Sequence, residues 1–460
     1  MYDGAQFSTS KLVSWLFPDP RSAGLFETPE PMRLTQRDKL VAVILAVLFF
    51  GMHVYLFWGE WAVDASAYYF AGHFYDIGQF DQVYAGPPQI IGPEIPESWA
   101  AALAQIGYPD EQTYPFIYLP WVAALMAPVT RTLDPQNFMN GVLIINTALM
   151  VICSGLAWRI IGGSRNPLWI WAIISFGILT TSSASVLALS LGQIQILVFA
   201  CCLLAIERYR AGAFWLAGAA LALAACLKIT PAAFILIFIW DRNWRALSGF
   251  AVVCAIIGAY SYAVVGMDLH HEFFGLLHDL NQQIFIAFLA FSVEGFAFQI
   301  WDLLNGTAMV LTDHEYTYPK PAWIDHTAKA IFAFGVLALW LTTRNLGASD
   351  RIPRQFIALS ILIPITAPLG WIHYFLLTGF LLPGLACHMG KRMAALLILG
   401  YFVLLNSYLV VILLFPELRF TPQIVLCVPF LLFMFGAIVA GKRPQEVAKT
   451  EKPLHAVPAE

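Results

Sequence analysis

The stretch from Trp58 to Gly72 reads WGEWAVDASAYYFAG and stands where a long apolar run ends and a carboxylate follows. If Leu40 to Trp58 crosses a membrane, Asp64 lies about one helical turn beyond the end of that span, at the water boundary. Tyr68 and Tyr69 stand on the following turn. Such a position suits a charged base of a membrane enzyme.

The composition indicates a polytopic membrane protein. Of the 460 residues, 59% are hydrophobic and 12% are charged, with a mean hydropathy of +0.71, whereas soluble proteins carry about 25% charged residues. The net charge of -4 comes without the clustered Lys and Arg that a nucleic-acid partner would require. All seven cysteines lie in apolar stretches without CxxC or Cys/His spacing. We therefore expect buried thiols, and no disulfide framework, metal centre or cofactor.

The distribution of basic residues predicts the orientation in the membrane. No Lys or Arg stands between Lys39 and Arg131, and the hydrophilic stretch 59–113 carries eight acids. The stretch between Arg245 and Lys320 also lacks basic residues but contains many acids and histidines. We expect two large exoplasmic loops, at 59–113 and 266–321. Basic residues collect instead in short connections that we expect in the cytoplasm, at 159–165, 207–210, 241–245, 344–354, 391–392 and 442–443.

About twelve transmembrane helices are expected in a membrane domain that spans residues 39–442. The candidate spans are 40–58, 138–158, 168–187, 190–206, 213–227, 231–240, 245–265, 323–343, 355–370, 373–388, 393–414 and 423–441. Residues 1–38 are polar, with basic residues just before the first span, and predict a retained cytoplasmic arm. Residues 443–460 are charged and proline-bearing and predict a disordered cytoplasmic tail.

Four segments within this frame need a separate interpretation. Ala65 to Ile77 and Glu97 to Ile106 show helical spacing in the first loop, and we expect both helices on the membrane surface. Pro115 to Val129 is apolar but short and interrupted by prolines, which predicts a partial, membrane-dipping helix. Ile229 to Trp240 is also short, so the chain breaks at Lys228, near the outer face. A break at membrane depth is tolerated where it lines a cavity.

Asp64 is the candidate base. An acid in an exposed loop is usually only solvated, and seven other acids share this loop. The position of Asp64 beyond the span end favours a functional role, as do the neighbouring Trp58, Trp61, Tyr68 and Tyr69. Aromatic walls control the solvation and the pKa of a carboxylate, as a general base requires. The residues alone leave both interpretations open.

Three outer turns offer partners for Asp64. Lys228 interrupts an apolar run, which suggests function, although it could also snorkel to the interface or pair with a loop carboxylate. His373 stands among aromatic residues at a helix start and could contact a phosphate or belong to the interfacial aromatic belt. Gln193 could bond a ligand, or it could bond the free backbone groups of a helix end. The residues alone favour the second use. The convergence of the three turns on the side of Asp64 is the signal for a site.

Together these side chains suggest displacement at a sugar carbon. Lys228 and His373 would hold a lipid-linked phosphate, while Asp64 would take the proton of an acceptor hydroxyl. The chain contains no obvious metal cluster, Walker loop or GxGxxG fingerprint. Nucleotide-driven chemistry is therefore not expected.

Several segments resemble a known family. They are the Asp64 stretch with Tyr68-Tyr69 and Ala71-Gly72, the segment from Tyr114 to Pro120, Gly192-Gln193, the segment from Leu227 to Pro231, and Trp371-Ile372-His373. In order and spacing they are similar to the landmarks of the polyprenyl-phosphate-sugar-dependent GT-C glycosyltransferases, specifically glycosyltransferase family 87. The resemblance runs from about residue 40 to about residue 440. Two departures are Gln195, where the family often has asparagine, and Tyr374, where it often has a second histidine.

The resemblance implies an all-α GT-C fold and assigns roles to individual residues. It implies Asp64 as the base and Lys228 and His373 as the groups facing the donor phosphate. The remaining residues expected along the substrate cavity are Gln193, Tyr118, Tyr68 and Trp371.

The resemblance also implies a reaction and a location. A sugar would pass from a polyprenyl phosphate to a hydroxyl of an exoplasmic glycolipid or polysaccharide. Mannose, as in the mannosyltransferases of the family, or an arabinofuranose-type pentose is the favoured sugar. The expected location is a bacterial inner membrane, with the site on the periplasmic side. A transporter or flippase for a lipid-linked sugar is the alternative, and a polymerase or ligase for lipid-linked glycans would share the outer cavity. The absence of an evident inverted repeat and the gathering of polar residues at one face favour the enzyme.

Overall fold

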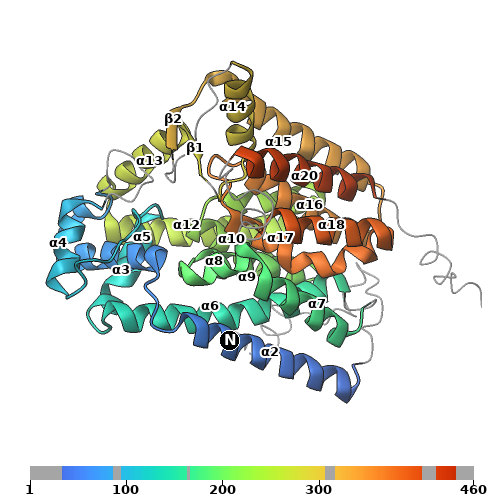
Figure 1. Ribbon diagram of the computed structural model, residues 1–460, viewed down its shortest axis with the longest axis horizontal. Coiled ribbons are helices and arrows are strands. Elements are labelled where there is room, and N and C mark those ends of the chain that lie inside the picture. Colours follow the sequence, from blue (N-terminus) through green and yellow to red (C-terminus); the bar gives the residue numbers. More distant parts are fainter. Residues whose placement is uncertain are drawn as a thin grey trace, which may run out of the picture.

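The protein is almost entirely helical, with long helices running along one common direction (Figure 1). The computed structural model describes residues 34–85, 95–162, 166–287, 289–305, 316–406 and 421–441. Most of the N-terminal arm, the C-terminal tail and parts of both large loops therefore lie outside the described residues, and the predictions made for them stay predictions.

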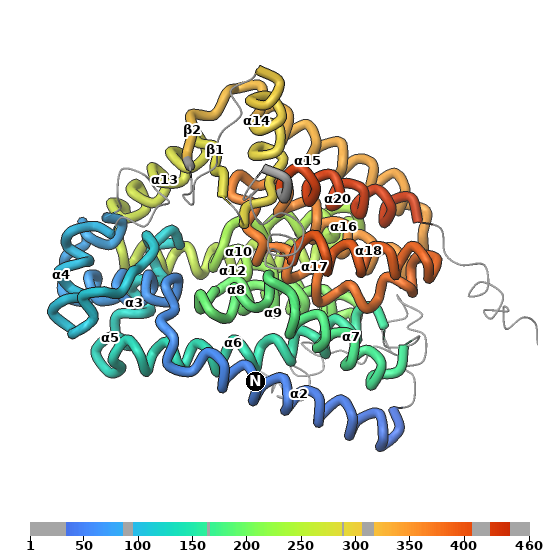
Figure 2. The backbone as a smooth tube through the Cα atoms, in the orientation of Figure 1, coloured from blue at the N-terminus to red at the C-terminus, as the bar shows by residue number. Residues whose placement is uncertain are grey.

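The first half of the described chain forms α2 (Gln36–Phe57), α3 (Val63–Asp76), η1 (Phe80–Gln82), α4 (Glu97–Gln105), α5 (Pro120–Thr130), α6 (Pro135–Ala157), η2 (Trp158–Gly162), α7 (Leu168–Thr181), α8 (Ser183–Ser190), α9 (Gln195–Arg210) and α10 (Phe214–Leu227). The second half forms η3 (Thr230–Phe234), α11 (Ile235–Trp240), α12 (Trp244–Val265), α13 (Asp268–Asn281), β1 (Gln283–Ile286), α14 (Val293–Leu304), β2 (Tyr316–Pro319), α15 (Ala322–Thr343), α16 (Ala348–Thr366), η4 (Ile372–Phe375), α17 (Leu376–Leu381), η5 (Leu382–Cys387), α18 (Lys391–Leu404) and α20 (Thr421–Ala440). Figure 2 follows the same path from blue to red.

Several helices are long and apolar enough to cross a membrane, which makes the chain an integral membrane protein. Among the described residues there are four of them, namely α2, α6 continued by η2, α12 and α15. Helices α7 and α8, bent by 65° at their junction, make a fifth if they form one broken span. The number of about twelve spans stays a prediction, because segments such as α10 and α5 are apolar helices shorter than a full span.

Helix α2 shows how the sequence fixes a membrane helix. Thr35 caps its start, accepting a hydrogen bond from the Asp38 N–H, while the Asp38 carboxylate accepts one from the Thr35 N–H. Apolar side chains cover the helix all round, and most of them, Leu40 and Val47 included, are exposed on the protein. An exposed apolar surface of this kind suits contact with lipid.

Helix α10, with 14 residues, is shorter than its neighbour α12, with 22 residues. Gly218 of α10 lies against Ala246 of α12, and the Cys226 and Cys254 sulfurs are 3.9 Å apart, so the two helices run in the same direction. A side chain at Gly218 would collide with the backbone of α12, which explains the small residue there. Lys228 therefore lies beside the middle of α12 rather than at its C-terminal end.

The basic turns meet at one end of the molecule. Glu207 binds Arg159 and Arg208, and Arg351 binds Asp241 at 2.7 Å. These contacts join the turns after α6, α9 and α11 and the start of α16, all of them segments that the charge distribution assigned to one side. The residues of the candidate site lie at the other ends of these helices.

The first large loop carries two helices, as predicted, but α3 is not a surface helix. Nine of its 14 residues are buried, and it packs closely against α5. Gly72 allows this approach, since a Cβ atom there would lie 2.6 Å from the Met126 Cβ atom. Helix α3 thus belongs to the core, while α4 covers it through the buried Trp99. The partial helix predicted over 115–129 corresponds to α5.

The second large loop contains a two-stranded antiparallel sheet that was not predicted from the sequence. Strands β1 and β2 pair antiparallel, with Ile284 opposite Tyr318. The sheet lies between α13 and α14, in the upper part of Figure 1. A buried ion pair, Lys320 with Glu294 at 2.7 Å, joins the end of β2 to the first turn of α14.

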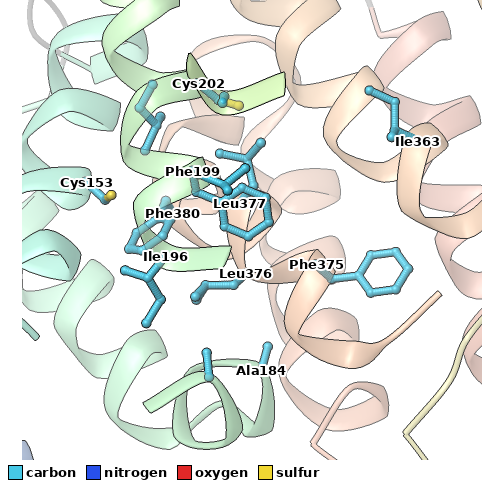
Figure 3. Packing of buried hydrophobic residues seen from close by; sticks show 14 of the residues in the cluster. Cys153, Ala184, Ile196, Phe199, Cys202, Ile363, Phe375, Leu376, Leu377 and Phe380 are labelled. Carbon is cyan, nitrogen blue, oxygen red and sulfur yellow. The ribbon is translucent and has the colours of Figure 1, made fainter. Parts of the chain in front are cut away.

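The interior between α6, α9 and the segment after α16 is tightly packed and apolar. Figure 3 shows Cys153 of α6 and Phe199 of α9 beside Leu377 and Phe380 of α17. All seven cysteines are free, and five are buried, in agreement with the expected apolar role. This packed centre holds the helices whose ends build the site.

Candidate functional site

Turns from distant parts of the chain surround one cavity of about 700 Å³. Six of the seven residues predicted for the site line it, namely Asp64, Tyr118, Gln193, Lys228, Trp371 and His373. Tyr68, the seventh, lies directly behind the wall, with its hydroxyl 3.5 Å from that of Tyr118. The structure therefore brings together the predicted residues, although the sequence separates the first and last by about three hundred positions.

Asp64 sits in the first turn of α3, where the helix dipole favours a negative charge. Its backbone N–H donates to the Leu191 carbonyl at 3.1 Å, and that of Ala65 donates to the same oxygen at 3.2 Å. The side-chain amide of Gln193 donates to the Asp64 carboxylate. The Gln193 side chain thus orients the candidate base. It does not bond a helix end, which was the use that the residues alone favoured.

The turn between α8 and α9 is fixed against α3 on both sides. Gly192 has φ +67°, and a Cβ atom there would lie 2.6 Å from the Ala65 Cβ atom. The Tyr68 hydroxyl donates to the Gly192 carbonyl at 3.2 Å and accepts from the Ile194 N–H at 3.1 Å. From helix α6, the Asn146 side-chain amide donates to the Gln193 carbonyl at 3.1 Å. The orientation of Gln193 toward Asp64 therefore rests on this close approach.

The two tyrosines beside Asp64 remain protonated. Burial, with the Asp64 charge adding to it, raises the pKa of Tyr68 above its ordinary value. Burial also raises the pKa of Tyr118, and the neighbouring Tyr68 and Asp64 act in the same direction. Both phenols are therefore neutral hydrogen-bonding groups in the wall.

Lys228 places a cation opposite Asp64. It follows the last turn of α10 in an extended conformation, with φ -152° and ψ 130°. Its Nζ atom lies 4.2 Å from the ring centroid of Tyr374 and 5.8 Å from that of Tyr118. Burial lowers the pKa of Lys228 to about 7, and the Asp64 charge offsets part of this shift. A cation among aromatic rings is well suited to bind an anion that enters the cavity.

His373 and Trp371 enter the cavity from the segment after α16. Their rings are stacked, 6.5 Å apart at 11°. The Ile372 N–H donates to the Leu289 carbonyl and the Phe291 N–H to the Gly370 carbonyl, each at 2.7 Å. The second large loop therefore holds this wall by its backbone, and Leu289 itself lines the cavity.

Three aromatic residues expected around Asp64 lie elsewhere. Trp58 is 55% exposed, Trp61 donates to the Gln112 carbonyl at 2.6 Å, and Tyr69 donates to the Leu133 carbonyl at 2.8 Å. The prediction that these three side chains surround Asp64 is therefore wrong, because the turn before α3 directs the two tryptophans away from it. Tyr374 stands in the wall instead.

An apolar groove adjoins the site cavity. It has a volume of about 1190 Å³ and shares Ile117, Tyr118, Lys228 and Tyr374 with the cavity. Its outer wall is the apolar side of α13, including Phe273, Phe274 and Leu277. A smaller cavity of about 340 Å³ lies on another side and contains Gln195, so the second glutamine of the motif does not face Asp64's cavity.

In the part of the chain that the structure describes, no three His, Cys, Asp or Glu side chains lie together as metal ligands would. Two other acids of the first loop, Asp76 and Asp110, differ from Asp64 and do not line its cavity. Asp76, for example, pairs with Arg131, and that ion pair lowers its pKa. Asp110 is exposed.

Comparison with known families gives one result that covers just over half of the chain. The description of glycosyltransferase family 87 matches residues 116–367. No curated protein matches the chain. The matched region contains Tyr118, Gln193 and Lys228, and the fold adds Asp64 and His373 from outside it. The chain therefore belongs to glycosyltransferase family 87, and it is an integral-membrane glycosyltransferase.

Proposed function

We propose that the protein transfers a sugar from a polyprenyl phosphate to a hydroxyl of an exoplasmic glycolipid or polysaccharide. The observation that carries the proposal is that the cavity holding Asp64, Gln193 and His373 meets an apolar groove at Lys228. A lipid phosphate needs such a junction, with a cation for its phosphate and an apolar surface for its chain. Mannose or a pentofuranose is the favoured sugar, as the sequence resemblance implies.

The proposed reaction is a displacement at the anomeric carbon. Asp64 takes the proton of the acceptor hydroxyl, and the acceptor oxygen forms a bond to that carbon. The bond from the carbon to the phosphate oxygen breaks, and the polyprenyl phosphate leaves with the electron pair. Lys228 and His373 stabilise the charge of the leaving phosphate. Gln193 holds the Asp64 carboxylate in a fixed orientation during the proton transfer.

The proposed side of the membrane follows from charge. The cavity lies at the helix ends opposite the basic turns that Glu207 and Asp241 hold together. By the positive-inside rule those turns face the cytoplasm, so the cavity faces outward. An outward cavity suits a lipid-linked donor and an acceptor of the cell envelope, and we place the protein in a bacterial inner membrane.

The central test replaces the base. Membranes that contain the protein are supplied with radiolabelled polyprenyl-phosphate mannose or polyprenyl-phosphate pentofuranose, and labelled glycolipid is measured. We expect Asp64→Asn to reduce transfer by about 100-fold to 10,000-fold, the usual contribution of a general base. Asp110→Asn, an exposed acid of the same loop, is the matched control.

Two outcomes would count against the proposal. Wild-type protein that transfers sugar from neither donor would exclude the donor class, and near-normal transfer by Asp64→Asn would exclude the base. Transport of the intact lipid-linked sugar, without a new glycosidic bond, would support the flippase alternative. Mass spectrometry of glycolipids from a deletion strain identifies the natural acceptor.

A further inference from the structure

Tyr374 occupies a junction that the proposed reaction has not yet used. It lies in η4 directly after His373 and is 7% exposed. Its side chain belongs to the wall of the site cavity, of the apolar groove and of the smaller cavity beside Gln195. A residue in this position stands between the cavity that holds Asp64 and His373 and the apolar groove.

The Tyr374 ring contacts both groups assigned to the phosphate. The Lys228 Nζ atom lies over its face, 4.2 Å from the centroid. The His373 ring meets it at 4.7 Å with an interplanar angle of 87°. The Tyr118 ring, at 5.8 Å, holds Lys228 less closely. Since Lys228 leaves α10 as a single extended residue, the Tyr374 face is the nearer support for its ammonium.

We propose that Tyr374 is a positioning residue that holds the Lys228 ammonium at the boundary between the site cavity and the apolar groove, and so selects lipid phosphates as donors. The inference rests on the proposed function, because the sugar must enter the cavity and the chain must enter the groove. The phosphate then lies between them, beside Lys228, and the first part of the chain passes along the Tyr374 ring.

The chemistry of the ring makes the proposal specific. Tyrosine and phenylalanine both present a π face to the ammonium and an apolar edge to the groove. Leucine and methionine fill similar space but lack the face. The phenol hydroxyl is not required, so phenylalanine should rescue what leucine and methionine lose.

The first measurement is donor kinetics with wild type and with Tyr374→Phe, Tyr374→Leu and Tyr374→Met. We expect the Leu and Met variants to raise the donor KM about tenfold, with the acceptor KM unchanged. The Phe variant should restore the donor KM to within about twofold of the wild-type value. A merely structural role would not separate the two substrates in this way.

The second measurement does not require sugar transfer. Acylation of Lys228 by an amine-reactive reagent is followed by peptide mass spectrometry, with and without farnesyl phosphate. We expect faster labelling in the Leu and Met variants than in wild type and the Phe variant, and weaker protection by farnesyl phosphate. If the Leu variant fails to fold in detergent, the Met variant carries the comparison.

The outcomes separate this inference from the proposed function. If the wild-type protein uses no polyprenyl-phosphate sugar, the proposed function is wrong. The labelling experiment still tests the contact between Tyr374 and Lys228 in that case. Normal wild-type transfer with the same donor KM in all three variants overturns the role of Tyr374, whatever the labelling shows. Equal labelling in all variants overturns it as well.

Discussion

Gly192→Ala should disable the enzyme by moving Asp64, the proposed base. Gly192 has φ +67°, a conformation in which other residues lose roughly 1–2 kcal/mol. The added Cβ atom would stand 2.6 Å from the Ala65 Cβ atom, whereas carbon atoms pack at about 3.5–4.0 Å. The start of α3, which carries Asp64, must therefore retreat by roughly 1 Å from the turn that holds Gln193.

A shift of this size has a known effect on catalysis. Displacing a reacting group by about 1 Å can lower the rate by about 100-fold. We therefore expect sugar transfer by Gly192→Ala to fall by about two orders of magnitude, more than the loss of stability explains. Initial rates in membranes, normalised to the amount of folded protein, measure the effect.

Gly78→Ala is the matched control. Gly78 follows the same helix α3 and has φ +75°, but a Cβ atom there meets nothing within 4 Å. Gly78→Ala reports the cost of the positive φ alone, whereas Gly192→Ala adds the collision, so only Gly192→Ala should lose transfer. Adding Ala65→Gly to Gly192→Ala removes the colliding atom and should recover activity. Equal rates for Gly192→Ala and Gly78→Ala would refute the dependence of Asp64 on this contact.

Three further predictions concern groups around the cavity. Lys228→Met should raise the donor KM about tenfold or more, measured against varied polyprenyl-phosphate sugar, because a charge-assisted contact to the phosphate is lost. Asn146→Leu removes the hydrogen bond to the Gln193 carbonyl and should lower the rate about fivefold, with little change in donor KM; an equal loss in donor binding would contradict this. Glu294→Gln leaves the buried Lys320 without its counter-charge and should cost about 3–5 kcal/mol in unfolding experiments. The double change Glu294→Met with Lys320→Met should be far milder, and equal losses in both proteins would contradict the reasoning.

The sequence predicted which residues come together better than it predicted the contacts that bring them together. Charge asymmetry placed the turns of Gln193, Lys228 and His373 on one side, and the structure brings all three to the cavity of Asp64. That inference needed only the order of apolar segments and basic turns, both of which are local properties of the chain.

What the sequence could not predict depends on contacts between distant segments. Strands β1 and β2 have four residues each and are separated by α14, so no local pattern marks their pairing. The direction of Trp58 and Trp61 depends on how the turn before α3 packs. In the sequence, Tyr374 stood out only because the family often has a histidine at this position. Its place in the cavity wall became clear only from its contact with Lys228.

The site is built on helix ends and breaks, and this has a physical consequence. Asp64 starts α3, Gln193 lies between α8 and α9, Lys228 follows α10, and His373 follows α16. Backbone groups at such places need partners when they lie at membrane depth. Here the Leu191 carbonyl accepts from the start of α3, and the Leu289 carbonyl accepts from the segment before His373. The bonds that satisfy the backbone are therefore the bonds that position Asp64, the proposed base, and the segment of His373, a proposed phosphate-binding group. A substitution that loosens one of these turns should consequently impair stability and catalysis together, whereas substitutions on the lipid-facing surfaces should affect neither strongly.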